Sequence, residues 1–176
     1  TNGVQNGASF QPGIVPNSWV TIKGSNLSPF TDTWNNSIVN GRLPTVLDGV
    51  TVTIGGKPAF VGYVSPTQIN AQVPYEVLEG SNVPVVVTVN GVSSSPGTVA
   101  VVAAAPGIFQ FGQKRAVVQN ADYSVNNTDN GAAAGSYVVA YLTGSGQTDH
   151  VVPTGAAAQR DPLARPRGTV TATVNG

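Results

Sequence analysis

Apolar and polar residues alternate over much of the chain with the period of a β-strand. The clearest case is Val-Thr-Val-Thr-Ile at residues 50–54, where alternate side chains would line one face of a sheet. No window of about eleven residues has apolar side chains at helical spacing without an intervening Gly or Pro. The β-branched, alternating runs predict strands at residues 18–22, 50–54, 83–89, 98–102, 116–119, 137–142 and 169–174.

Turn residues separate these runs. The 21 glycines and 13 prolines leave mostly strand-length segments between them, and proline is strongly unfavourable inside a helix. Gly55-Gly56, Asn90-Gly91 and Asn175-Gly176 end predicted strands with residues that adopt positive φ, as tight hairpins require. The gaps have no room for crossover helices, so we expect an all-β fold of antiparallel sheets.

The chain also contains an internal repeat. Residues 50–56, Val-Thr-Val-Thr-Ile-Gly-Gly, align with residues 170–176, Val-Thr-Ala-Thr-Val-Asn-Gly. Upstream of these, Ser-Trp-Val at 18–20 aligns with Ser-Tyr-Val at 136–138. The order of these landmarks is the same in both halves. Chance similarity among strands rich in Val and Thr is the alternative explanation.

A break between the halves lies at residues 103–107, Ala-Ala-Ala-Pro-Gly. We therefore predict two consecutive immunoglobulin-like β-sandwich domains, residues 1–105 and residues 106–176. The residues expected to point inward include Trp19, Ile22, Val52, Ile54, Val87, Val101, Val139 and Tyr141.

Several segments resemble known families. Residues 16–27, Pro-Asn-Ser-Trp-Val-Thr-Ile-Lys-Gly-Ser-Asn-Leu, resemble the opening strand pair of IPT/TIG immunoglobulin-like domains. Together with residues 43–50, 63–74, 104–109 and 116–126, they resemble an uncharacterised C-terminal domain family first noted in secreted proteins of Solibacter and other acidobacteria. That resemblance implies secretion and a modular placement. It brings no catalytic residue or ligand.

The second copy of the repeat is shorter than the first. The first copy continues from Lys57 to Ala105 with further strands, whereas the second has no counterpart of that segment, and the family resemblance implies a continuation past Gly176. We therefore expect the second sandwich to lack its later strands. Exposed sheet edges and an open core are unfavourable, so one of three arrangements is expected. The missing part belongs to a longer chain, the second module is smaller, or another subunit supplies a strand.

In the last case we expect the donor to be the N-terminal segment, residues 1–10, with Val4, Ala8 and Phe10 as its apolar side chains, or an equivalent extended piece. Strand addition between subunits can build a filament.

Composition narrows the classes of function. Eight basic and eight acidic residues give no net charge, which excludes strong electrostatic attraction to nucleic acid. The apolar runs are strand-length, so we expect no membrane insertion. There is no Cys and no Met, and the chain begins with Thr1. With the abundance of small polar residues, this favours a secreted or cell-surface bacterial protein.

Catalytic chemistry is not indicated. His150 is the only histidine, and Ser145 and Asp149 are its neighbours in a loop without the Gly-x-Ser-x-Gly pattern of a nucleophile elbow. We predict no enzyme, no cofactor and no site built on nitrogen and sulfur metal ligands.

The sequence is compatible both with a calcium site and with the absence of one. Asp122, Ser124 and Asn126 have the spacing of an EF-hand, but Asn127 and Ala133 replace its Gly and Glu. A different calcium site and consecutive polar turns are both compatible with Asp122, Asn126, Asn127 and Asp129.

Trp34 is the candidate ligand-binding residue. It lies in the polar stretch 31–36 without apolar alternation, so its indole is expected either to be exposed or to cover the edge of the first sandwich. The sequence therefore predicts a non-enzymatic structural or adhesion module whose partners are copies of itself or other domains of a longer parent chain. A carbohydrate-binding module that recognises polysaccharide through Trp34 is the alternative.

Overall fold

The computed structural model describes residues 3–112 and 115–173. Over these residues the fold is all-β, as predicted, and the one helical element is a single 3-10 turn, Trp34–Asn36. The strands pair antiparallel throughout the sheets. Antiparallel neighbours can be joined by short turns, so this pairing needs no crossover helices, as the sequence predicts.

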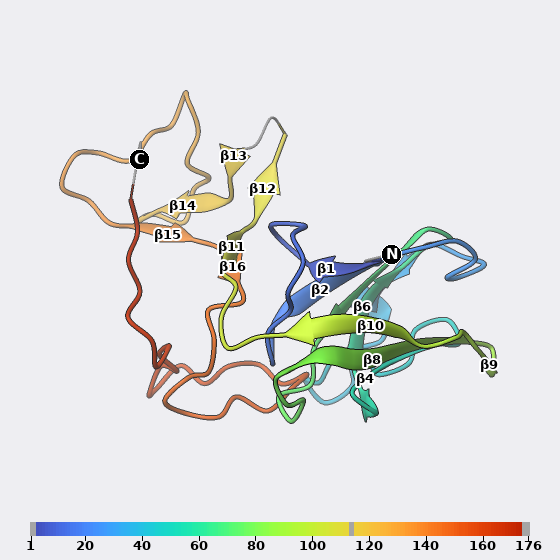
Figure 1. The fold of residues 1–176 in the computed structure, drawn as a ribbon. Helices are drawn as coiled ribbons and strands as arrows, with labels where there is room; N and C mark the ends of the chain where they lie inside the picture. Colours follow the sequence, from blue (N-terminus) through green and yellow to red (C-terminus); the bar gives the residue numbers. More distant parts are fainter. Residues whose placement is uncertain (1–2, 113–114, 174–176) are drawn as a thin grey trace.

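The first half of the chain folds into two facing sheets (Figure 1). The first sheet has five strands in the order β1 (Val4–Asn6), β2 (Trp19–Lys23), β7 (Gln68–Gln72), β6 (Phe60–Val64) and β3 (Asp32–Thr33). The second contains β10 (Gly97–Val101), β8 (Gly80–Val89), β4 (Val50–Ile54) and β5 (Lys57–Pro58), with β9 (Val92–Ser93) paired to β8.

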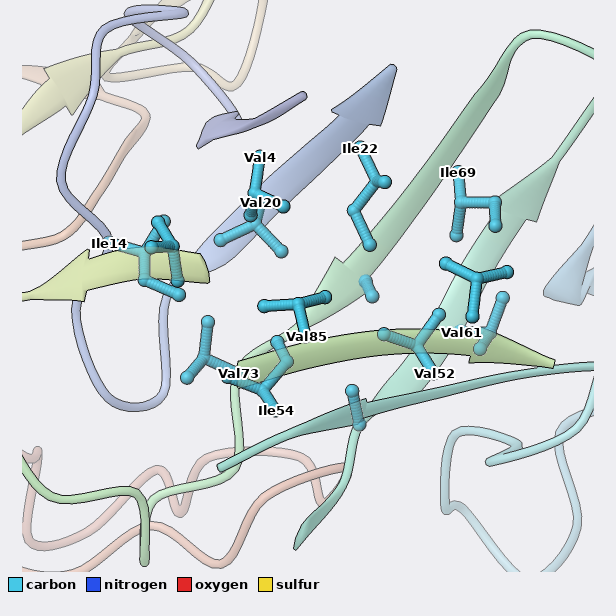
Figure 2. Close-up of a cluster of buried hydrophobic side chains, with 14 of the residues drawn as sticks. Val4, Ile14, Val20, Ile22, Val52, Ile54, Val61, Ile69, Val73 and Val85 are labelled. Carbon is cyan, nitrogen blue, oxygen red and sulfur yellow. The ribbon is translucent and has the colours of Figure 1, made fainter. Parts of the chain in front are cut away.

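The core lies between these sheets and follows the alternation seen in the sequence. Val50, Val52 and Ile54 of β4 are buried, and the two threonines between them are half-buried. Val20 and Ile22 of β2 meet them from the first sheet, as Figure 2 shows. The period-2 pattern thus fixes which face of each strand enters the core.

Most of the predicted inward residues of the first half are buried, namely Ile22, Val52, Ile54, Val87 and Val101. Trp19 differs. It is half-buried on the outer face of the first sheet, because its neighbours Val20 and Ile22 fill the core. Trp19 and Val20 are both apolar, so the sequence pattern alone does not decide which of the two points into the core. In the structure Val20 does.

Two predicted hairpin turns are formed. Gly55 and Gly56 join β4 to β5 with φ of 59° and 74°. Asn90 and Gly91 join β8 to β9 with φ of 49° and 85°. These positive values explain the choice of Gly and Asn at both turns. The third predicted turn, Asn175-Gly176, lies outside the described residues.

The described residues of the second half form only small sheets. Figure 1 shows them in yellow to orange beside the first sandwich. They are three two-stranded ladders, β11 (Gly107–Ile108) with β16 (Leu142–Thr143), β12 (Gln110–Phe111) with β13 (Arg115–Ala116), and β14 (Val118–Asn120) with β15 (Val138–Ala140).

No apolar side chain beyond Val101 is buried in the described part of the chain. Val139 and Tyr141, predicted to point into a core, are 44% and 42% exposed. That prediction is wrong because, among the described strands, no second sheet packs against these residues. A strand side chain is buried only when another layer covers its face.

The strand predicted at residues 169–174 is also not formed over residues 169–173, and Val174 lies outside the described residues. Its counterpart in the repeat, β4, pairs with β8 along its whole length. The second half offers residues 169–173 no such partner among the described strands, so their backbone groups have no ladder to join.

Hydrogen bonds connect the second half of the chain back to the first half. The Ala105 N–H donates to the Gly144 carbonyl at 3.0 Å, and the Tyr75 N–H donates to Thr154 Oγ1 at 2.7 Å. Farther along, the Gly155 N–H donates to Gln72 Oε1 at 2.9 Å. The division into two domains near residue 105 stays a prediction.

Candidate functional site

Two tryptophans meet on the outer face of the first sheet. Trp19 begins β2 and Trp34 begins the 3-10 turn, and their ring centroids lie 5.1 Å apart at an interplanar angle of 60°. Edge-to-face pairs of this kind contribute roughly 0.5 to 1.5 kcal/mol beyond their buried area. Trp34 is therefore half-buried against another indole and not fully exposed.

Gly62 of β6 makes this close packing possible. A Cβ atom at residue 62 would lie 2.6 Å from Cζ3 of Trp34 and 3.1 Å from Cζ3 of Trp19. Neither distance leaves room for a side chain. The bare backbone of Gly62 thus forms the floor on which both indoles lie.

A cavity of about 350 Å³ opens beside the indoles. Its aromatic walls are Trp19, Trp34, Tyr63 and Phe109, and Phe109 comes from the second half. None of its lining residues carries a charge at neutral pH. Flat apolar rings with a few polar groups suit a neutral ligand that has both apolar and hydroxyl surfaces.

Asn70 is one of the polar groups of the cavity. Its Oδ1 accepts hydrogen bonds from Thr21 Oγ1 at 3.1 Å and from Gln68 Nε2 at 2.8 Å. Both bonds use the carbonyl side of the amide. The Nδ2 group of Asn70 makes no hydrogen bond to the described residues and is available as a donor to a ligand.

The predicted donor segment forms part of the first sandwich. Val4 and Ala8 are buried, whereas Phe10 is 50% exposed. Val4 pairs with Ile22 of its own chain, so β1 is the edge strand of the first sheet. Donation of this segment to another subunit stays a prediction.

The structure reveals a second part of the internal repeat. The tripeptide Val-Gln-Asn occurs at β1 and again at β14. Asn6 pairs with Val20, and Asn120 pairs with Val138, so both tripeptides meet the aligned Ser-aromatic-Val segments in the same register. Sequence reasoning missed this match, although the identical letters were a usable signal.

The two repeated ladders differ in what lies on their other side. In the first sheet β2 has β1 at one edge and β7 at the other. Within the described residues β15 has β14 at one edge and no strand at the other. Val20 is fully buried, while its counterpart Val138 is 47% exposed.

The structure brings His150 next to Asp149 but not next to Ser145. Nδ1 of His150 lies 2.9 Å from Oδ1 of Asp149, and both side chains are exposed. The same carboxylate oxygen accepts the backbone N–H of Arg165 at 2.8 Å, which lowers the pKa of Asp149, with a smaller contribution from His150. No hydrogen bond among the described residues links Ser145 to His150.

The candidate calcium residues are engaged in turns. Asp122 Oδ1 accepts the N–H and the hydroxyl of Ser124, which lowers the pKa of Asp122. Asn127 Oδ1 accepts the N–H groups of Asp129 and Asn130 at 2.8 Å. No three His, Asp or Glu side chains gather around a common point in residues 3–112 and 115–173.

Comparison with known families identifies the first half. The IPT/TIG domain family matches residues 9–101, which is more than half of the chain and ends at the last residue of β10. The chain belongs to the IPT/TIG domain family. IPT/TIG domains are immunoglobulin-like modules that are generally non-enzymatic and take part in protein interactions.

No curated protein matches the chain. No described helix has the length and apolar character to cross a bilayer. The IPT/TIG match covers the lining residues of the aromatic cavity except Gly7 and Phe109, and it does not extend to β15.

Proposed function

We propose that this IPT/TIG protein is an adhesion or structural module of a secreted or cell-surface bacterial protein, and that it joins other polypeptides through its second half. One observation carries the proposal. The second half exposes the side chains of β15, residues 138–140, whereas their counterparts Val20, Thr21 and Ile22 in the first half are buried. Exposed apolar strands with an unpaired edge favour association with another chain.

Location outside the cell is part of this proposal. The chain has no Cys or Met and only 9% charged residues, a composition that suits an oxidising, protease-rich medium. The five-motif resemblance to domains of secreted acidobacterial proteins supports the same location.

Assembly of the protein into a filament would require a further structural change. It requires the N-terminal segment to leave its own sheet, where Val4 packs in the core. Removal of an edge strand exposes apolar surface and breaks ladder hydrogen bonds. The geometry therefore favours a partner other than the N-terminal segment of a second copy.

Adherence of cells that display the whole protein tests the adhesion function. We expect displaying cells to bind surfaces coated with cell-envelope material, and we expect protease treatment of the coat to abolish binding. Cells displaying Val138→Lys serve as the control, because a charge at this open strand disfavours apolar and edge-to-edge contact. Equal adherence of both cell types would contradict the proposal.

Carbohydrate binding is the second candidate, favoured by the aromatic cavity. Trp34, Tyr63 and the free amide group of Asn70 offer stacking surfaces and a donor to a neutral sugar. A glycan array probed with the whole protein tests this function. Trp34→Ala should remove the signal, while Phe30→Ala, an exposed aromatic outside the cavity, should keep it.

A further inference from the structure

We propose that Asn70 is the hydrogen-bond donor by which the aromatic cavity recognises an uncharged saccharide, and that Gln68 is the positioning residue that keeps this donor directed at the ligand. The inference rests on the carbohydrate-binding function proposed above and adds the polarity of its recognition group. It is carried by a chain of hydrogen bonds that runs from Lys23 through Gln68 to Asn70.

The hydrogen-bond chain lies on the outer face of the first sheet. Ile69 and Ala71 of β7 are fully buried in the core. Gln68 and Asn70 alternate with them and therefore point to the other face. Lys23 of β2 lies directly opposite Gln68 in the strand pairing. Side chains directly opposite each other on one face of an antiparallel pair are close enough to interact, so the register of β2 and β7 brings the chain together.

Lys23 sets the direction of both amides. A lysine ammonium group can only donate hydrogen bonds, and Nζ of Lys23 donates to Oε1 of Gln68. This bond turns the Nε2 group of Gln68 toward Asn70, where it donates to Oδ1 at 2.8 Å. Oδ1 also accepts the hydroxyl of Thr21 at 3.1 Å. The NH2 side of Asn70 is therefore the part left for a ligand in the cavity that this residue lines.

The residues around Asn70 form a row that suits the hydroxyl groups of a saccharide. Thr21 and Tyr63 lie opposite Asn70 on the two neighbouring strands, and Thr33 lies opposite Tyr63. All four residues line the cavity. Neighbouring strands lie about 4.8 Å apart, so the row extends for about 14 Å across the sheet. The indole of Trp34 lines the same cavity and supplies an apolar surface for the C–H face of a sugar ring.

The charge of the cavity selects a neutral saccharide over an anionic one. None of the lining residues carries a charge at neutral pH. Lys23, the cation of the hydrogen-bond chain, is exposed and is not among the lining residues. Desolvation of a sugar carboxylate in this cavity would therefore be uncompensated.

Titration calorimetry of the whole protein with defined saccharides tests the proposal. The neutral probes are cellohexaose, maltohexaose and mannohexaose, and the anionic probe is hexagalacturonate. We expect at least one neutral probe to bind and the anionic probe not to bind. Gln68→Glu replaces the donor that faces Asn70 by a carboxylate oxygen that can only accept. The Asn70 amide then turns its NH2 group away from the ligand, and the affinity should fall about tenfold or more.

Two further variants separate positioning from a general structural effect. Lys23→Gln combined with Gln68→Lys exchanges the two side chains but still offers a donor to Oδ1 of Asn70, so it should bind within about threefold of the wild type. Gln11→Glu adds the same charge as Gln68→Glu at an exposed side chain outside the cavity lining. It should also bind within about threefold of the wild type. Circular dichroism should be the same for all these proteins.

Equal affinity of the wild type and Gln68→Glu would overturn the proposal, and so would loss of binding in the exchanged double variant. Binding of hexagalacturonate as tight as that of the neutral probes would overturn it too. If Trp34→Ala abolishes binding but Gln68→Glu leaves it unchanged, carbohydrate binding stands and this inference alone fails. Absence of binding to all three neutral probes would contradict the carbohydrate-binding function itself and, with it, this proposal.

Discussion

The β1–β2 and β14–β15 ladders share the tripeptide Val-Gln-Asn and the same pairing register, but their surroundings differ. Asn6 lies in a sheet that faces another sheet, and Asn120 lies in a two-stranded ladder. Local pairing is the same in both because it depends on nearby sequence and turns. Burial differs because it depends on a second layer that only the first ladder has.

The largest expected difference concerns the shared asparagine. Asn6 Nδ2 donates to the Ala105 carbonyl at 2.8 Å, and its Oδ1 accepts the N–H groups of Ala8 and Ser9. Loss of three bonds in a buried setting should make Asn6→Ala cost about 3 kcal/mol. Urea denaturation followed by tryptophan fluorescence measures this, since both tryptophans report on the first half.

Asn120→Ala is the matched change. Its side chain bonds Asn126, Ser124 and Asn130, all within the second half. We expect no shift of the fluorescence midpoint, but faster hydrogen exchange at residues 118–120. A fluorescence shift as large as that of Asn6→Ala would contradict the comparison.

The next difference concerns the valines opposite these asparagines. Val20→Ala removes two methyl groups from a fully buried position and should cost about 2 kcal/mol. Val138→Ala should change the free energy of unfolding by less than about 0.5 kcal/mol, because the side chain is half exposed. Equal costs would mean that Val138 is as buried in solution as Val20, and this result would contradict the comparison.

A smaller difference in stability is expected on the outer faces of the two ladders, where Trp19 and Tyr137 lie. Trp19 is covered by Trp34, whereas its counterpart Tyr137 is exposed. Gly62→Ala puts a Cβ against Trp34 and should cost about 1 to 2 kcal/mol through overpacking. It should also change the near-ultraviolet circular dichroism of the indoles. Gly168→Ala, where a Cβ meets nothing within 4 Å, is the control.

The smallest effect is a response to acid in the second half. The pKa of Asp149 is lowered by the Arg165 N–H and by His150. A lowered pKa stabilises the folded state above the unfolded value of about 3.9, and this stabilisation is lost as pH falls through the folded pKa. We expect the Arg165 amide resonance to shift below about pH 4 in the wild type. It should not follow that titration in Asp149→Asn.

The sequence predicts much of the first sandwich for a physical reason. The alternation at β4 is unbroken, so both its limits and its buried face follow from the pattern. Trp19 lies on the face opposite to the predicted one, because Trp-Val in β2 allows two registers and only packing against the second sheet decides between them.

Less of the candidate site could be predicted. The polar surroundings of Trp34 identify it as a candidate, but its contacts with Trp19 and with the backbone of Gly62 bring together residues distant in sequence. Phe109 reaches the same cavity from the other half. Such convergence depends on tertiary packing, which single-sequence periodicity does not encode.

The contacts of Thr154 and Gly155 determine how the molecule responds to stretching. Besides their bonds to Tyr75 and Gln72, the Leu43 N–H donates to the Gly155 carbonyl at 2.8 Å. A pull on the chain beyond these residues therefore reaches the first sandwich directly. Strands β11 to β15 lie between the first sandwich and this clamp, so they carry no tension until the clamp opens. Strand β15 can thus stay paired with β14 while the protein is under mechanical load.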